Sequence, residues 1–236
     1  MNVFVLKIIA CIAMLIDHFG AAILLPALGE PWFSAEIYEL TRGIGRIAFP
    51  IFAYLIAQGC MHTKNIGKYL LRLALLAIIS EPFFDTAFRF WEGGVNFLAD
   101  TNIFYTLFLG AAAIAIYEKT RPRLGDFAGF LAATPTLAVA WLLSTDYAHI
   151  GVGLILLIYI MRPENRLNRC IALAVGMAAL YINSPVHLLF SLVAVALVAL
   201  YNGKPGPNSA AVKWGFYFFY PAHIAALIAV RSIFFT

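Results

Sequence analysis

Ionisable side chains stand inside some of the most apolar stretches of this 236-residue chain. Asp17 and His18 interrupt one such stretch, and Glu81 interrupts another. A charged group in a membrane-spanning helix costs roughly 2.5–3.5 kcal/mol even on a lenient scale, which makes it a candidate functional residue by default. A histidine oriented by a carboxylate can take a proton from an amine or a hydroxyl. We therefore predict His18, Asp17 and Glu81 as catalytic residues.

The carboxylate that orients His18 is expected to come from another helix. Consecutive residues on an α-helix point about 100° apart, so Asp17 and His18 cannot both face one target. Glu81, Asp85 and Asp146 are the acids predicted to take this place beside His18.

Two pairs of charged residues have the spacing of one helix turn. Arg42 and Arg46 are four residues apart and share a helix face, as do Glu81 and Asp85. If the pairs face each other, they form a charge network, and Pro82 is expected to kink or end the helix between the acids. An equally weighted alternative makes these residues architectural ion pairs.

Further polar residues are expected to join the same site, in the outer half of the membrane, and to bind substrate. His223 has an alternative role, a hydrogen bond to a backbone carbonyl that Pro221 leaves free. The predicted substrate-binding residues are Arg42, Arg46, Asp85, Asn102, Tyr105, Asp146, Tyr220 and His223.

No metal site is expected, because the sequence has no His-x-x-x-His or Glu-x-x-His pair within a predicted helix and no paired cysteines. Nucleophile elbows and phosphate-binding glycine loops are also missing. From the residues alone, acid–base catalysis and ion-coupled transport both stay open.

The composition indicates that such a site lies within a membrane. Hydrophobic residues make up 63% of the chain and charged residues only 12%, against about 25% charged residues in soluble domains. A membrane protein is predicted, so the net charge of +4 is read as basic membrane-flanking loops rather than as a nucleic-acid surface. Asp17 and His18 also argue against a cleaved signal peptide in the first run.

Apolar runs predict an all-α integral membrane protein, a single bundle of about nine transmembrane helices, with eight to ten allowed. The runs are Phe4–Leu25, Ile44–Met61, Tyr69–Phe88, Ile103–Tyr117, Phe127–Leu143, Ile150–Met161, Cys170–Ile182, Val186–Tyr201 and Val212–Arg231. Short turns separate them, so residues 1–236 are expected to form one domain.

Lys and Arg are concentrated in every second predicted loop, and this bias predicts the orientation of the chain in the membrane. Most of the sixteen Lys and Arg residues fall on the side of the N-terminus, which the positive-inside rule places in the cytoplasm. The expected location is a bacterial inner or plasma membrane, crossed several times. The opposite loops hold mainly acids, among them Glu30, Glu36 and Asp146.

The order of motifs resembles the TraX family, named for a membrane protein required for N-terminal acetylation of F-type pilin. The matching stretches are Leu6-Lys7 through Asp17-His18, RGIGRIAFPIFAYLIAQG from Arg42, KYLLRLALLAIISEPFFD from Lys68, NIFYTLFLG from Asn102, DYAHIGVGLILLIY from Asp146 and KWGFYFFYPAHI from Lys213. They run from end to end of the chain.

This family looks related to the transmembrane acyltransferases, many of which carry a basic residue eleven positions before a histidine on an early helix. Lys7 and His18 have that spacing, with Lys where Arg is commoner. The resemblance implies acetyl-CoA as acyl donor from the cytoplasm and an extracytoplasmic acceptor. The phosphates of acetyl-CoA are expected to bind the basic residues Lys7, Lys64, Lys68, Arg72 and Arg121.

The expected activity is therefore N- or O-acetyl transfer to an amine or hydroxyl, with a pilin-like protein, another peptide, an amino sugar or a small amine as acceptor. His18 would act as general base or form an acetyl-histidine intermediate, and Arg42, Arg46, Asn102 or Tyr105 would hold the oxyanion. Two alternatives stay open: a proton-coupled small-solute transporter, and a non-catalytic membrane assembly factor.

Overall fold

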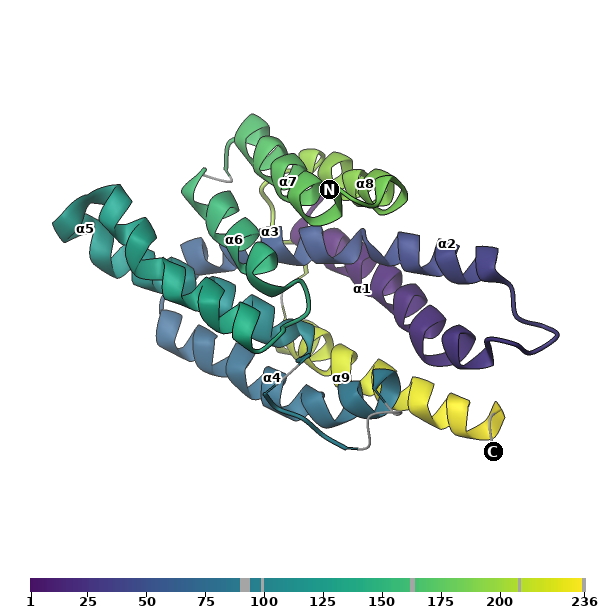
Figure 1. The fold of residues 1–236 in the computed structure, drawn as a ribbon. Helices are drawn as coiled ribbons and strands as arrows, with labels where there is room; N and C mark the ends of the chain where they lie inside the picture. Colours follow the sequence, from purple (N-terminus) through teal and green to yellow (C-terminus); the bar gives the residue numbers. More distant parts are fainter. Residues whose placement is uncertain (90–93, 99, 162–163, 208, 235–236) are drawn as a thin grey trace. The chain divides into compact units, whose positions relative to one another are not determined.

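The computed structural model describes residues 1–89, 94–98, 100–161, 164–207 and 209–234. Over these ranges the secondary structure is helical and contains no strand, which confirms the all-α part of the prediction. The helices are α1 (Val3–Phe19), α2 (Ala35–Gly45), α3 (Ala48–His62), α4 (Ile66–Phe88), α5 (Ile103–Leu142), α6 (Ala148–Ile160), α7 (Arg166–Tyr181), α8 (Pro185–Ala199) and α9 (Ala210–Phe234) (Figure 1). A π-helical turn, Gly20–Leu24, and a 3₁₀ turn, Leu25–Ala27, continue α1.

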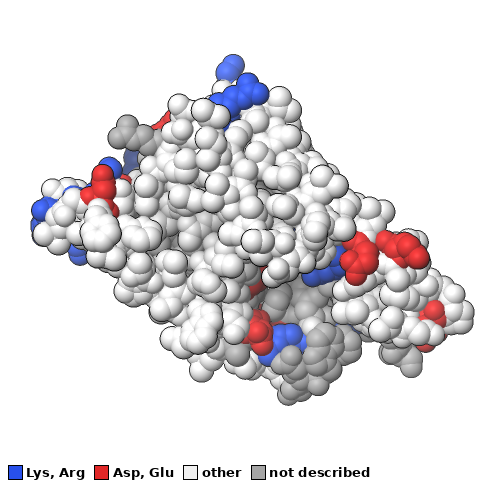
Figure 2. All heavy atoms as spheres, turned by 45° about the horizontal axis from the view of Figure 1, so that its top comes forward, with Lys and Arg blue, Asp and Glu red and all other residues white. Residues whose placement is uncertain are grey.

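Among the described residues, four helical stretches are long and apolar enough to cross a membrane. They are Val3–Ala27, Ala35–His62, Ile103–Leu142 and Ala210–Ile233, and the shorter helices α6 and α8 are also apolar. In Figure 2, most of the visible atoms belong to residues other than Lys, Arg, Asp and Glu, and charged side chains in a membrane are costly. The protein is thus a helical membrane protein, while the number of about nine spans stays a prediction.

Pro50 explains why α2 and α3 are separate helices. A proline inside a helix removes its own N–H donor and clashes with the carbonyl four residues earlier, which here belongs to Arg46. The helix is interrupted at Arg46 and Ile47, and the Arg46 amide turns to the Gly43 carbonyl at 3.0 Å. The apolar run predicted from Ile44 therefore begins inside a helix that starts earlier, at Ala35, where the Ser34 hydroxyl accepts from the Ile37 amide.

Helix α5 consists of two arms that fold back on each other. Gly125 has φ 86° and ψ 168°, outside the helical region, and a glycine reaches such a positive φ without steric cost. A Cβ placed on Gly129 would lie 3.0 Å from the Tyr117 ring, and residues twelve apart meet only if the chain reverses. The two apolar runs predicted before and after this turn correspond to the two arms.

Helix α4 differs from the expectation at Pro82. The helix continues through the proline to Phe88, so it does not end between Glu81 and Asp85. The Thr86 hydroxyl donates to the Pro82 carbonyl at 2.7 Å, one turn later. The two acids therefore stay on one helix, as their spacing predicted.

The chain divides into two compact units. Unit 1 comprises Met1–Ile51, Pro82–Val95 and Asn183–Thr236, and unit 2 comprises Phe52–Glu81 and Asn96–Ile182. Their boundaries fall within α3 and α4. Each unit is described below by itself.

In unit 2, the first arm of α5 and helix α6 run parallel. Their starts are joined by the bond from the Asp146 amide to the Thr101 carbonyl, 2.9 Å long, and Tyr117 and Tyr159 meet near their other ends with ring centroids 6.4 Å apart. The part of α4 around Ala77 also lies at the Asn102 end of this unit, because the Asn102 side chain donates to the Ala77 carbonyl. Its basic segments consequently share the opposite end; they include Lys64, Lys68, Arg72, Lys119, Arg121, Arg123 and Arg166.

In unit 1, the start of α1 is attached to the segment between α8 and α9. The Val3 amide donates to the Lys204 carbonyl at 3.0 Å, and the Asn2 side chain caps α1 by accepting from the Val5 amide. Helices α1, α2, α8 and α9 pack closely: a Cβ on Gly43 would lie 2.6 Å from the Phe190 ring. This packing brings residues from both ends of the sequence into one core.

Candidate functional site

Two histidines from distant parts of the sequence form a direct hydrogen bond in unit 1. His18 Nδ1 lies 2.7 Å from His223 Nε2, and His223 Nδ1 lies 2.7 Å from the Phe219 carbonyl one turn earlier in α9. The two side chains are buried, with 9% and 7% exposure. The pair lies inside helices that the composition places in the membrane.

Aromatic rings surround this pair. The rings of Phe88 and Tyr220 lie 4.8 Å and 5.7 Å from the His18 ring, between centroids. Phe219 stacks on His223 at 4.7 Å with an angle of 19° between the planes. These rings fix the imidazole planes and keep water away, so the polar pair sits in an apolar shell.

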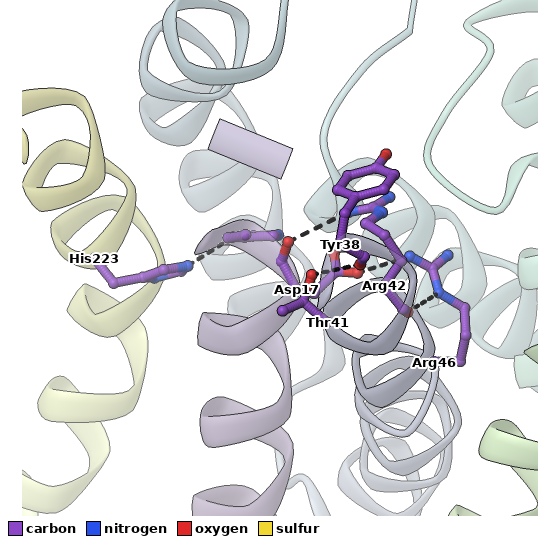
Figure 3. A network of polar contacts seen from close by, with 7 residues as sticks. Asp17, Tyr38, Thr41, Arg42, Arg46 and His223 are labelled. Carbon is purple, nitrogen blue, oxygen red and sulfur yellow. Dashed lines mark hydrogen bonds and ion pairs between the residues drawn. The ribbon is translucent and has the colours of Figure 1, made fainter. Parts of the chain in front are cut away.

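Asp17, the neighbour of His18, receives two guanidinium groups. Arg42 Nη1 donates to Asp17 Oδ2 and Arg46 Nη2 donates to Asp17 Oδ1, both at 2.8 Å. Arg46 Nε also donates to the Arg42 carbonyl at 2.9 Å, which satisfies an acceptor at the end of α2. Figure 3 shows Asp17 between α1 and α2 with both arginines directed toward it, while His223 approaches α1 from another side.

Glycines permit the close approach of α1 and α2. A Cβ on Gly45 would overlap the Asp17 carboxylate, and one on Gly20 would overlap the Thr41 hydroxyl. The Thr41 hydroxyl itself donates to the Tyr38 carbonyl at 2.7 Å. Small residues at these positions are therefore required for the arginines of α2 to reach α1.

The structure revises the predicted surroundings of His18 and of the arginines. The group bonded to the His18 ring is His223 rather than an acid, because α9 packs on that face of α1. The carboxylate that both arginines share is Asp17. Asp17 and His18 point about 100° apart and therefore face different helices, as expected: Asp17 faces α2 and His18 faces α9. His223 bonds the Phe219 carbonyl, not the Tyr217 carbonyl that Pro221 leaves without its usual donor.

Other predicted residues of unit 1 lie around the end of α4. Asp85 is 2% exposed and Arg89 Nη1 lies 3.6 Å from its Oδ1. Tyr220 is buried beside both histidines, with its ring centroid 5.6 Å from that of His223. Tyr220 thus belongs to the surroundings of the histidines, whereas the ion-pair partner of Asp85 is Arg89, just after the end of α4.

Glu81, Asn102 and Asp146 lie in unit 2, where their bonds involve the backbone. Asn102 is fully buried; its side chain donates to the Ala77 carbonyl at 2.8 Å and to Glu81, whose Oε2 also accepts from the Asn102 amide at 3.1 Å. The Asp146 carbonyl accepts from the Thr106 hydroxyl. Tyr105 follows in the first turn of α5, its amide bonded to the Asn102 carbonyl.

The basic residues predicted to bind acetyl-CoA occupy two places. Lys64, Lys68, Arg72 and Arg121 are exposed at the basic end of unit 2. Lys7 lies in α1 of unit 1, with Nζ 5.1 Å from the centroid of the Phe216 ring. Over the described residues, no group of three or more His, Cys, Asp or Glu side chains is arranged to hold a metal ion.

Three residues of the site were missed by sequence reasoning. Phe88 and Phe219 contact the histidines, and their only sequence signal was membership of aromatic-rich runs. Arg231 donates from two nitrogens to the carbonyls of Thr86 and Ala87, both at 2.6 Å, and so holds the end of α4 that carries Phe88. In the sequence, Arg231 was only the last residue of the apolar run Val212–Arg231 and had no predicted role.

Comparison with known proteins identifies the family. The family model described as TraX protein matches residues 3–231. The chain belongs to the TraX family. The matched range contains every candidate site residue named above, so the resemblance drawn from the motifs is confirmed.

One curated relative extends this match over both full chains. It is described as "Probable fimbrial assembly protein FimC, serogroup H1", from Dichelobacter nodosus, and is 28% identical over 247 residues. The alignment covers 98% of the present chain and 96% of the relative. No solved structure matches the chain.

Proposed function

We propose that this TraX family member is a membrane-embedded acetyltransferase, which moves an acetyl group from acetyl-CoA to an amine or hydroxyl acceptor. The observation that carries the proposal is the buried, directly bonded His18–His223 pair within apolar helices. Burying a polar pair costs free energy unless all of its hydrogen-bonding groups have partners, so a pair kept inside a membrane is a candidate functional site. The fimbrial assembly relative supports a pilin-like protein, acetylated at its N-terminus, as the acceptor.

The reaction needs one base and one acyl donor. His18 accepts a proton from the acceptor amine as the nitrogen attacks the thioester carbonyl carbon. The new C–N bond forms, the C–S bond breaks, and the proton passes to the departing thiolate, giving the acetylated amine and free CoA. Attack by His18 itself, through an acetyl-imidazole intermediate, gives the same products in two steps.

Charged residues near His18 support binding roles. Arg42 and Arg46 each have several N–H donors, and we assign them to negative charge on the acceptor or in the transition state. Lys7 lies eleven residues before His18, about 16 Å along α1 at 1.5 Å per residue. Lys7 is our candidate in unit 1 for a CoA phosphate, with Lys64, Lys68, Arg72 and Arg121 the candidates in unit 2.

We further propose that the chain crosses a bacterial inner membrane several times, up to the nine spans of the sequence prediction, with the N-terminus in the cytoplasm. Support comes from the gathering of basic segments at one end of unit 2. Single cysteines at Lys64 and Ser144, at opposite ends of this unit, should be labelled by membrane-impermeant maleimide from opposite sides. Labelling of both from one side would refute the topology.

The activity is tested with purified protein in detergent, labelled acetyl-CoA and a panel of acceptors. The panel contains a pilin N-terminal peptide, an amino sugar, a small amine and a hydroxyl acceptor. Wild type and His62→Ala, an exposed-histidine control, should both transfer label, and His18→Ala should lose at least about 100-fold. Absence of transfer from the wild type to every acceptor would overturn the proposal.

A further inference from the structure

The Phe219 carbonyl determines where the protons lie on the two histidines. A carbonyl oxygen only accepts hydrogen bonds, so His223 Nδ1, 2.7 Å from it, carries the hydrogen. In the neutral ring the other nitrogen, His223 Nε2, then presents a lone pair. His18 Nδ1, 2.7 Å from that lone pair, must be the donor. One backbone carbonyl therefore fixes the tautomer of both rings.

The ring geometry is that of an in-plane hydrogen bond. The two imidazole planes are inclined by only 14°, and their centroids are 4.9 Å apart. Face-to-face stacking would hold the planes more than 3 Å apart and exclude a 2.7 Å contact between ring nitrogens. The rings therefore lie edge to edge in nearly one plane, so the His18 N–H points along the His223 lone pair, as a strong hydrogen bond requires.

This arrangement leaves His18 Nε2 without a hydrogen. In unit 1, the described residues offer this nitrogen no hydrogen-bond partner, so its lone pair is available to a ligand. An imidazole side chain in water prefers the opposite tautomer, with the proton on Nε2. The contact with His223 thus imposes the less common form.

We propose that His223 is a positioning residue that holds His18 in the tautomer with a basic Nε2. The catalytic meaning of this assignment rests on the proposed acetyl transfer. When Nε2 takes the proton of the acceptor, His18 becomes an imidazolium whose Nδ1–H remains on His223. If Nδ1–H passes to His223 Nε2, the positive charge moves to His223 while its Nδ1–H stays on Phe219.

The pair does the work that a carboxylate does in a Ser-His-Asp triad, where the third residue selects the tautomer. The difference is charge. A carboxylate buried beside His18 would bring a net charge into an apolar shell, at a cost of several kcal/mol, whereas two neutral imidazoles bring none. A histidine partner thus suits a base that lies inside a membrane.

The tautomer is measured directly by nitrogen NMR of protein labelled with ¹⁵N-histidine in detergent or nanodiscs. The His18 signals are those that disappear in His18→Gln. In the wild type, Nδ1 should have the shift of a protonated nitrogen and Nε2 that of an unprotonated one at high pH. A protonated Nε2 in the wild type would overturn the proposal whether or not the protein transfers acetyl groups.

Two substitutions of His223 separate positioning from packing. His223→Gln keeps an oxygen acceptor near the place of Nε2 and should retain kcat within about tenfold. His223→Leu removes the acceptor and should lower kcat by about 100-fold or more, with little change in KM, and should shift the His18 proton toward Nε2. Full kcat in a folded Leu variant would overturn the positioning role. The expected wild-type tautomer without any acetyl transfer would instead refute the proposed function alone.

Discussion

The two units hold buried polar groups in different ways. In unit 2, the Asn102 side chain donates to the Ala77 carbonyl and to the Glu81 carboxylate and accepts from the Phe104 amide, so backbone and side-chain partners together fix where α5 begins. In unit 1, side chains from different helices bond each other: His18 with His223, and Arg42 with Asp17. Side chains that bond the backbone determine the position of a helix end. Side chains that bond each other can change partner or proton while the helices stay in place, as the proposed proton transfer requires.

The largest expected effect on stability lies in unit 1, at Asp17. Asp17→Asn removes the carboxylate charge that two guanidinium groups share, and breaking such a partly buried set costs about 3 kcal/mol. The free energy of unfolding, measured by denaturant titration in detergent, should fall by this amount. Glu30→Gln, at an exposed acid, should change it by less than about 0.5 kcal/mol. An equal change in the free energy of unfolding for the two variants would show that the ion pairs of Asp17 stabilise the fold no more than an exposed acid does.

In unit 2, Asn102→Ala should lower the free energy of unfolding by about 2–3 kcal/mol. The change removes a helix cap, worth about 1 kcal/mol, and leaves the Ala77 carbonyl and the Glu81 carboxylate with fewer donors. Asn165→Ala removes the cap of α7, where Asn165 accepts from two backbone amides, and should cost only about 1 kcal/mol. If both variants lose the same amount, the bonds of Asn102 between helices contribute nothing measurable.

The close approach of α1 and α2 is tested by adding one methyl group. Gly45→Ala places a Cβ on the Asp17 carboxylate and should cost about 2 kcal/mol, as overpacking does. Gly215→Ala is the matched control, because a Cβ there meets open space and alanine favours helix more than glycine. Thermal unfolding should show a lower midpoint for the first variant and an unchanged or higher midpoint for the second.

The smallest effect is expected at Arg231, where a side chain from α9 bonds the last carbonyls of α4. Arg231→Met should cost about 1 kcal/mol, the upper range for a cation at a helix C-terminus. Arg231→Lys keeps the charge but loses the two-nitrogen geometry, so its loss should be smaller. A Lys variant as unstable as the Met variant would show that the geometry, rather than the charge, holds α4.

The sequence predicted the features that depend on local pattern. Apolar runs located the helices, and the acids of α4 shared a helix as their spacing required. The partner of His18 could not be predicted, because it depends on which helix packs against α1, and helical spacing determines a face without its neighbour. A turn between the runs Ile103–Tyr117 and Phe127–Leu143 was predicted, and the structure has it at Gly125. The continuation of α4 through Pro82 was not, since tertiary packing outweighs the local preference of proline.

The separation of 205 positions between His18 and His223 has a consequence for synthesis. At about 5–20 residues per second, the ribosome needs on the order of 10–40 s to deliver the second histidine after the first. Throughout this interval α1 is present without α9, the helix that carries the hydrogen-bond partner of His18. A nascent chain therefore lacks the His18–His223 bond until residue 223 has been synthesised and α9 has packed against α1.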